Sequence, residues 1–175
     1  SNVIDVLGKS IYPSFIDMYS DFGIEKPKRQ SGRSRSAQYD ATRTGYYWND
    51  HIMPENNALE SFKFDEKQAT ELRKIGFGVV NTHCEDGIIR GTGILVALNS
   101  EGNNATRLLS EKSGQYLSFS KSAKSNQLYP TSLMGSMALL RQVYLDANWY
   151  STGNAENKDL SLEALNRNKG LKQYY

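Results

Sequence analysis

The densest run of side chains that could do chemistry lies at residues 83–86, which read His-Cys-Glu-Asp. Alternate side chains of an extended strand share a face, so His83 and Glu85 could point the same way. With His51 they would form a two-histidine, one-carboxylate set of the kind that holds a transition metal. We favour the alternative that His83, Glu85 and Asp86 are polar residues at the carboxyl end of a strand. In parallel α/β folds the loops at that end gather around the site.

Three further groups could take part in chemistry, but each has a simpler explanation. Asp17 could transfer protons, although hydrogen bonding to backbone groups at a strand end is the favoured role. Cys84 would need a histidine brought to it by the fold, because the adjacent His83 would point the other way on a strand. The glycines of residues 91–93 are expected to form tight turns rather than a phosphate cradle, since no helix start follows them. We therefore predict no catalytic residue and no bound metal in this chain.

A basic stretch at residues 26–35 precedes the aromatic residues Tyr39, Tyr46, Tyr47 and Trp48. Positive charge next to aromatic rings could bind single-stranded nucleic acid. However, 21 Lys and Arg face 19 Asp and Glu, which leaves a net charge of only +2. This balance favours a solvated loop whose aromatic half docks on the domain. We predict that residues 26–35 are mobile, that residues 46–48 are docked, and that no nucleic acid is bound.

The length of 175 residues favours one domain. Cys84 is the only cysteine, so no disulfide can form within the chain, and a lone thiol leaves the compartment undetermined. No apolar run reaches the ~18 residues of a membrane span, so we predict no membrane insertion. The first residues have no basic region followed by an apolar one, so no signal peptide is expected. Ser1 and Asn2 could be a remnant of cloning.

Hydrophobic periodicity and capping residues predict strands that alternate with helices, an α/β pattern. In the longest helix the apolar stripe is expected on Leu133, Met137, Leu140 and Tyr144. Residues 21–57 show no clear period and are expected to form a long loop. The expected elements are extended segments at 4–6 and 11–18, a helix between Asp65 and Gly76, a buried strand at 77–82, antiparallel strands at 94–98, 106–109 and 115–120, and helices at about 132–150 and 159–169.

Residues 13–21, Pro-Ser-Phe-Ile-Asp-Met-Tyr-Ser-Asp, resemble the first barrel strand of the amidohydrolase superfamily, which reads Pro-Gly-Phe-Ile-Asp-x-His-x-His. Residues 4–9 resemble the end of the small β-sandwich that precedes that barrel. Residues 72–80 resemble the following helix and second strand. Residues 87–98 resemble the glycine-rich excursion of the imidazolonepropionase-like branch, and residues 129–142 resemble a helix start in bacterial members of that branch. The resemblance covers residues 4 to 170.

The resemblance implies a partial (β/α)₈ barrel that carries a small antiparallel excursion. Residues 1–9 would end a preceding β-sandwich, and residues 10–175 would form the N-terminal part of the barrel. In the family, zinc or a similar divalent metal is held partly by the two histidines of the first strand. Here those positions are Tyr19 and Asp21. A neutral phenol is a poor metal ligand because it must lose a proton with a pKa near ~10. The family's other ligands lie on later strands that this chain does not reach.

Two functions are compatible with these observations. The first is a fragment of a metal-dependent amidohydrolase-like protein, a family that hydrolyses cyclic or other non-peptide C–N bonds, and this chain would be a catalytically degenerate copy. The second is a non-catalytic binding module whose aromatic loop contacts a protein or glycan. In either case we expect the chain to need the rest of its parent, a second copy or another protein to complete its fold. The substrate, the oligomeric state and the compartment stay open.

Overall fold

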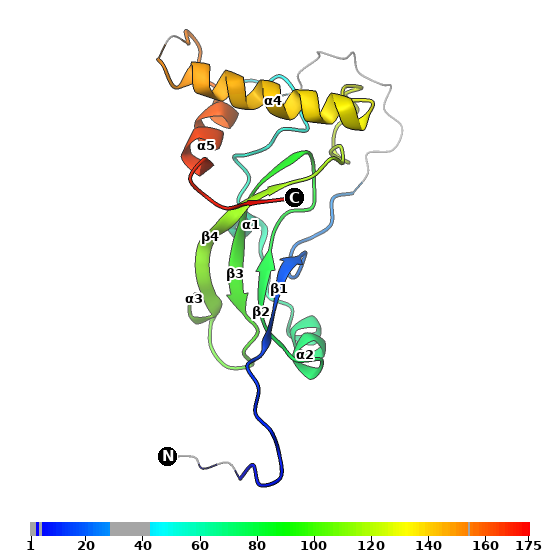
Figure 1. The fold of residues 1–175 in the computed structure, drawn as a ribbon, viewed down its shortest axis with the longest axis vertical. Coiled ribbons are helices and arrows are strands. Elements are labelled where there is room, and N and C mark those ends of the chain that lie inside the picture. Colours follow the sequence, from blue (N-terminus) through cyan, green and yellow to red (C-terminus); the bar gives the residue numbers. More distant parts are fainter. Residues whose placement is uncertain (1–2, 4, 29–42, 154) are drawn as a thin grey trace.

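The computed structural model describes residues 3, 5–28, 43–153 and 155–175. One five-stranded sheet, with the strand order β1-β2-β3-β4-β5, curls into a half-barrel (Figure 1). β1 runs parallel to β2, β2 to β4 form an antiparallel meander, and β5 pairs parallel with β4. The strands are β1 (Phe15–Ser20), β2 (Phe77–Thr82), β3 (Ile89–Ala97), β4 (Leu108–Leu117) and β5 (Gln173–Tyr174). The sheet is thus compatible with part of a barrel, with the expected antiparallel excursion after the second strand.

The connection between β1 and β2 contains α1 (Ala58–Ser61) and α2 (Glu66–Lys74). α2 begins as the sequence predicts, because the Asp65 carboxylate accepts hydrogen bonds from the backbone N–H groups of Lys67 and Gln68. It ends at Gly76, whose φ of 99° lets the chain turn into β2. A helix between two neighbouring parallel strands is the repeating unit of an α/β barrel.

The meander has two long strands instead of the three short ones that were expected. Residues 104–107, which overlap the start of the strand predicted at 106–109, form the one-turn helix α3 (Asn104–Arg107). The Asn103 side chain caps this turn by accepting a hydrogen bond from the Thr106 N–H. Capping by asparagine stabilises a helical turn that the β-propensity of Thr106, Leu108 and Leu109 did not suggest.

α4 (Leu133–Tyr150) and α5 (Leu160–Asn168) cover one end of the sheet (Figure 1). Their N-caps are Ser132 and Asp159, which agrees with the helix starts expected at about residues 132 and 159. The predicted apolar stripe of α4 is confirmed only in part. Leu140 and Tyr144 are half-buried against the core, whereas Leu133 and Met137 are exposed. The buried residues of the helix are Ser136, Leu139, Val143 and Ala147. Apolar residues occur on both sides of α4, and the side with Ser136 and Ala147 lets the helix approach its neighbours closely.

Two separate clusters form the hydrophobic core. The first lies between α4, α5 and the adjoining end of the sheet, and the buried Tyr47 belongs to it, as the predicted docking of residues 46–48 requires. The second packs α1 and α2 against the opposite end of the strands. The first cluster contains the buried residues Ile52, Ile88, Ile89, Leu117, Leu139, Val143 and Leu165. The second cluster contains the buried residues Phe22, Ala58, Ala69, Val80, Ile94, Val96 and Leu98.

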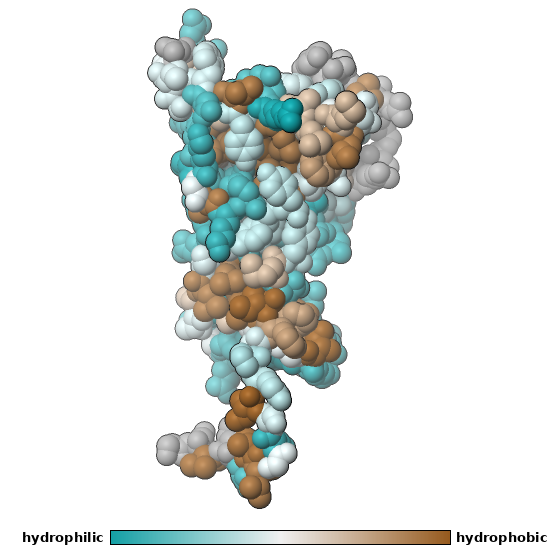
Figure 2. All heavy atoms as spheres, in the orientation of Figure 1, coloured by the Kyte–Doolittle hydropathy of each residue, from teal (hydrophilic) through white to brown (hydrophobic). Residues whose placement is uncertain are grey.

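The adjacent apolar residues Phe15 and Ile16 would suit a strand buried on both faces, but β1 is largely exposed. Phe15 is 66% exposed and Ile16 is 53% exposed, because β1 is the edge strand of the sheet and pairs only with β2. Figure 2 shows apolar surface gathered over this end of the sheet and on the extended N-terminal segment. The described part of residues 1–9 pairs with no strand, and its assignment to a preceding β-sandwich stays a prediction.

None of the helices in the described ranges is long and apolar enough to span a membrane. The predicted mobile stretch, residues 26–35, lies mostly outside the described residues, so its mobility also stays a prediction.

Candidate functional site

Tyr19, Asp21 and His83, three of the sequence-predicted site residues, lie at one end of the sheet. β1 and β2 are parallel, so their carboxyl ends meet, and Tyr19 and Asp21 at the end of β1 come close to His83 at the end of β2. The backbone N–H of His83 donates to the Ser20 carbonyl at 3.1 Å, which fixes the two strand ends together. The structure therefore brings Tyr19 and His83 into one cluster at the mouth of the half-barrel.

A guanidinium group lies at the centre of this cluster. Nη1 of Arg90, on β3, donates to the Tyr19 hydroxyl at 2.6 Å and contacts Nε2 of His83 at 3.3 Å. Since arginine has no acceptor, Nε2 must accept this hydrogen bond, and the proton of the neutral imidazole then resides on Nδ1. Nε of Arg90 donates to the Gly87 carbonyl at 3.3 Å. Only 9% of Arg90 is exposed, so a fixed positive charge is held inside the mouth.

Aromatic rings enclose His83. Its ring stacks on the Tyr116 ring with 3.8 Å between the ring centroids. The rings of Tyr19 and His83 form a T-shaped pair with 4.3 Å between their centroids. Tyr116 in turn stacks on Tyr174 of β5 at 4.9 Å. Gly93 makes room for this stack, because a Cβ atom there would lie 2.5 Å from the Tyr116 ring. Rings from four strands thus line the mouth of the half-barrel.

Burial, together with the nearby charge of Arg90, lowers the pKa of His83 to about 4. The Ser20 carbonyl opposes this shift, but the buried Nδ1 makes no hydrogen bond with it or with any other group among the described residues. His83 is therefore neutral at physiological pH. A neutral imidazole could bind a metal, but Nε2 is already engaged by Arg90.

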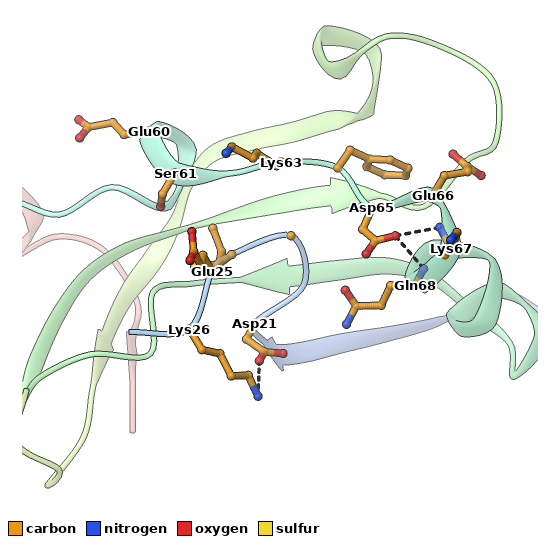
Figure 3. A pocket seen from close by; sticks show the side chains of 13 residues that line it. Asp21, Glu25, Lys26, Glu60, Ser61, Lys63, Asp65, Glu66, Lys67 and Gln68 are labelled. Atoms are coloured by element: carbon orange, nitrogen blue, oxygen red, sulfur yellow. Dashed lines mark hydrogen bonds and ion pairs between the residues drawn. The ribbon is translucent and has the colours of Figure 1, made fainter. Parts of the chain in front are cut away.

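Asp21 lies beside the cluster and has a different partner. Its carboxylate forms an ion pair with Lys26 at 2.8 Å, and this contact raises the pKa of the Lys26 ammonium. The pair borders an open groove of about 870 Å³ between the end of β1 and the start of α2 (Figure 3). Charged side chains of both signs project into the groove, among them Glu25, Asp65 and Lys67. Tyr19 and Asp21 thus have separate partners, Arg90 for the first and Lys26 for the second.

The remaining sequence candidates hold loops in place. Asp86 accepts hydrogen bonds from the Ser122 hydroxyl at 2.8 Å and the Ala123 N–H at 2.7 Å. Nδ1 of His51 accepts from the Ser122 N–H, and Nε2 donates to the Gln127 carbonyl. The described residues contain no group of three or more His, Cys, Asp or Glu that could hold a metal. The set of His51, His83 and Glu85 is therefore not assembled by them.

Three other candidates, Cys84, Glu85 and Asp17, have contacts outside the cluster around Arg90. The Sγ atom of Cys84 lies 3.6 Å from the Ser61 hydroxyl, and Glu85 acts on Lys26 through its charge. The carboxylate of Asp17 accepts from the Tyr19 N–H at 3.1 Å. This contact is the backbone role that the sequence favoured for Asp17.

Arg90, Tyr116 and Tyr174 were missed by the sequence analysis. A signal for Arg90 was available, since it is the one charged residue in the run Ile88 to Ala97, and a charge inside a buried strand needs a polar partner. Nothing local marks Tyr116 or Tyr174, because their stacking depends on the pairing of β4 with β5.

No protein-family model and no curated protein matches this chain. Among solved structures, an amidohydrolase from Thermotoga maritima MSB8 matches with a TM-score of 0.55 at 18% sequence identity. The chain shares the fold of part of that amidohydrolase. The match covers 93% of this chain and 45% of the other, so the chain spans less than half the length of the protein it resembles. A likeness at this level of identity concerns the fold alone.

Proposed function

We propose that this chain is the opening segment of an amidohydrolase-like (β/α)₈ barrel and that it is a catalytically degenerate copy. The observation that carries this proposal is the buried guanidinium of Arg90 between Tyr19 and His83. The parent family hydrolyses C–N bonds with a metal-activated water. In this chain a fixed organic cation occupies the mouth where the resemblance would put the first metal ligands.

The residues present do not fit a divalent metal. The position of the family's first histidine is Tyr19, whose hydroxyl already accepts a hydrogen bond from a cation. The position of the second is Asp21, which is paired with Lys26. Two positive charges ~4 Å apart repel each other by several kcal/mol inside a protein, so Arg90 opposes the entry of zinc. No catalytic step through a metal follows from this arrangement.

The fold supports the barrel part of the proposal. A parallel β1–β2 pair joined through α2, followed by an antiparallel meander, has the same overall path as part of the Thermotoga maritima amidohydrolase. The open edge of β1 and its exposed apolar side chains leave a surface that further barrel strands would cover. The partner implied by this surface is the remainder of the barrel.

Metal analysis tests the proposal. The purified chain is incubated with zinc, passed through gel filtration and assayed for metal per chain. We expect far less than one zinc per chain. A matched variant, Tyr19→His/Asp21→His/Arg90→Met, restores two imidazoles and removes the opposing charge, and it should retain more zinc than the parent chain. Near-stoichiometric zinc in the unaltered chain would overturn the proposal.

A further inference from the structure

Arg90 has hydrogen-bond donors that the described residues leave unused. Of its five N–H groups, the one on Nε points to the Gly87 carbonyl and the two on Nη1 point to Tyr19 and His83. Nη2 donates to none of the described residues. The buried polar atoms that have no hydrogen-bond partner do not include Nη2. Nη2 is therefore in contact with solvent. Two guanidinium donors therefore remain available at the mouth.

No carboxylate neutralises this guanidinium among the described residues. Two acids whose charges reach the cluster are otherwise engaged, Asp21 with Lys26 at 2.8 Å and Asp17 with the Tyr19 N–H at 3.1 Å. A charge that is nine-tenths buried without a counter-ion is unfavourable, and an anion that reaches it gains both charge pairing and hydrogen bonds. The site is thus deficient in acceptors and rich in donors.

Tyr19 supplies a further hydrogen-bond donor and an exposed aromatic ring beside Arg90. Its hydroxyl oxygen accepts from Arg90, so its own O–H proton can point away toward a ligand. Tyr19 is 43% exposed, in contrast to the fully enclosed Tyr116 behind it. The ring of Tyr19 therefore offers an accessible aromatic face or edge beside the free Nη2 donors.

We propose that this mouth binds the carboxylate group of a small organic acid. One carboxylate oxygen accepts from Nη2 of Arg90 and the other from the Tyr19 hydroxyl. The planar guanidinium fork suits the two oxygens of a carboxylate, and the Tyr19 ring favours an acid with a flat apolar body. Nδ1 of His83 is sealed from solvent and is not a ligand contact. This inference rests on the proposed function in one respect, namely that no metal occupies the mouth.

Benzoate and acetate are the probes. Each is titrated into the full chain in the presence of a chelator, and binding is followed by calorimetry and by the NMR signals of the tyrosine rings. We expect saturable binding, tighter for benzoate than for acetate. Arg90→Gln should weaken benzoate binding by about tenfold or more, the loss typical of a charge-assisted hydrogen bond. Tyr19→Phe, which keeps the ring, should weaken it by roughly threefold to tenfold.

Arg107→Gln is the matched control, because Arg107 pairs with Glu66 away from the mouth, and it should leave benzoate affinity unchanged. If Arg90→Gln does not fold, Arg90→Lys and Tyr19→Phe decide, and both must lower the affinity. Three results would overturn the proposal: no saturable binding, unchanged affinity in the Arg90 and Tyr19 variants, or inorganic phosphate that binds as tightly as benzoate. Because a chelator is present, a failure of the metal claim shows as zinc content in the separate metal assay and not as lost benzoate binding.

Discussion

At the residue scale, the cluster of Tyr19, His83 and Arg90 makes the stability of the fold depend on pH. The pKa of His83 falls from 6.5 to about 4 because of burial and the charge of Arg90, so the folded state binds a proton less readily than the unfolded chain. The contribution of neutral His83 to the free energy of unfolding is complete above the pKa of the unfolded chain. It is lost as the pH falls from about 6.5 toward 4.

We therefore predict that lowering the pH from 7.5 to about 4 removes roughly 2–3 kcal/mol of unfolding free energy through His83. Urea denaturation at a series of pH values measures this change. His83→Phe keeps a stacking ring and should flatten much of the slope. Some slope remains, because burial also lowers the pKa of His51. An unaltered slope in His83→Phe would show that His83 titrates normally.

Histidines restored at the mouth are not expected to restore chemistry. We predict that the double variant Tyr19→His/Asp21→His of this chain hydrolyses no cyclic amide or dipeptide. The superfamily that residues 13–21 resemble uses ligands from several later strands, and Arg90 still places a positive charge beside Tyr19. A panel of such substrates, assayed with added zinc, measures the outcome. Turnover above that of the unaltered chain would refute the fragment interpretation.

At the element scale, α4 has two apolar sides of which this chain buries one. Leu139 is 1% exposed and Leu145 is 63% exposed, although both are leucines of the same helix. Leu139→Ala should lower the unfolding free energy by about 2–5 kcal/mol, whereas Leu145→Ala should change it by less than about 0.5 kcal/mol. Denaturant titration of the two variants measures the difference. Equal losses would mean that the outward side of α4 is also covered.

The sequence predicts those elements that local residues specify. Asp65, Ser132 and Asp159 bond to backbone N–H groups within their own helices, so the three helix starts can be found from the sequence. The buried side of α4 cannot, because it depends on which apolar stripe meets α5 and the sheet. The one-turn helix α3 is a different case, because its cap Asn103 is a local residue that the sequence analysis did not weigh against the strand preference of the residues that follow.

In the site, too, some features are set by local sequence and others by tertiary contacts. The sequence could predict that Tyr19 and His83 lie at the same end of the sheet. Both lie at the carboxyl ends of strands that were expected to be parallel neighbours. The partner that decides their chemistry, Arg90, comes from β3 and reaches them only once the meander has folded back on β2. Its role therefore required the tertiary structure.

At the scale of the whole molecule, the described half-barrel is an open sheet with β1 and β5 at its two edges, and the β1 edge carries exposed apolar side chains. β1 pairs on one side only, and Phe15, Ile16 and Met18 along it are between 46% and 66% exposed. A barrel removes such edges by closing the ring of strands. An open edge next to exposed apolar side chains favours association with another strand or chain.

Sedimentation of the 175-residue chain tests the central claim, that the chain is an incomplete barrel, most directly. Velocity runs over a range of concentrations, together with thermal unfolding, report mass, compactness and cooperativity. We predict self-association that increases with concentration, or a partly ordered monomer without a sharp transition. Exposed Phe15 and Ile16 on β1 account for either result. A compact monomer at every concentration, with one cooperative thermal transition, would show a self-sufficient domain and would contradict the incomplete-barrel account.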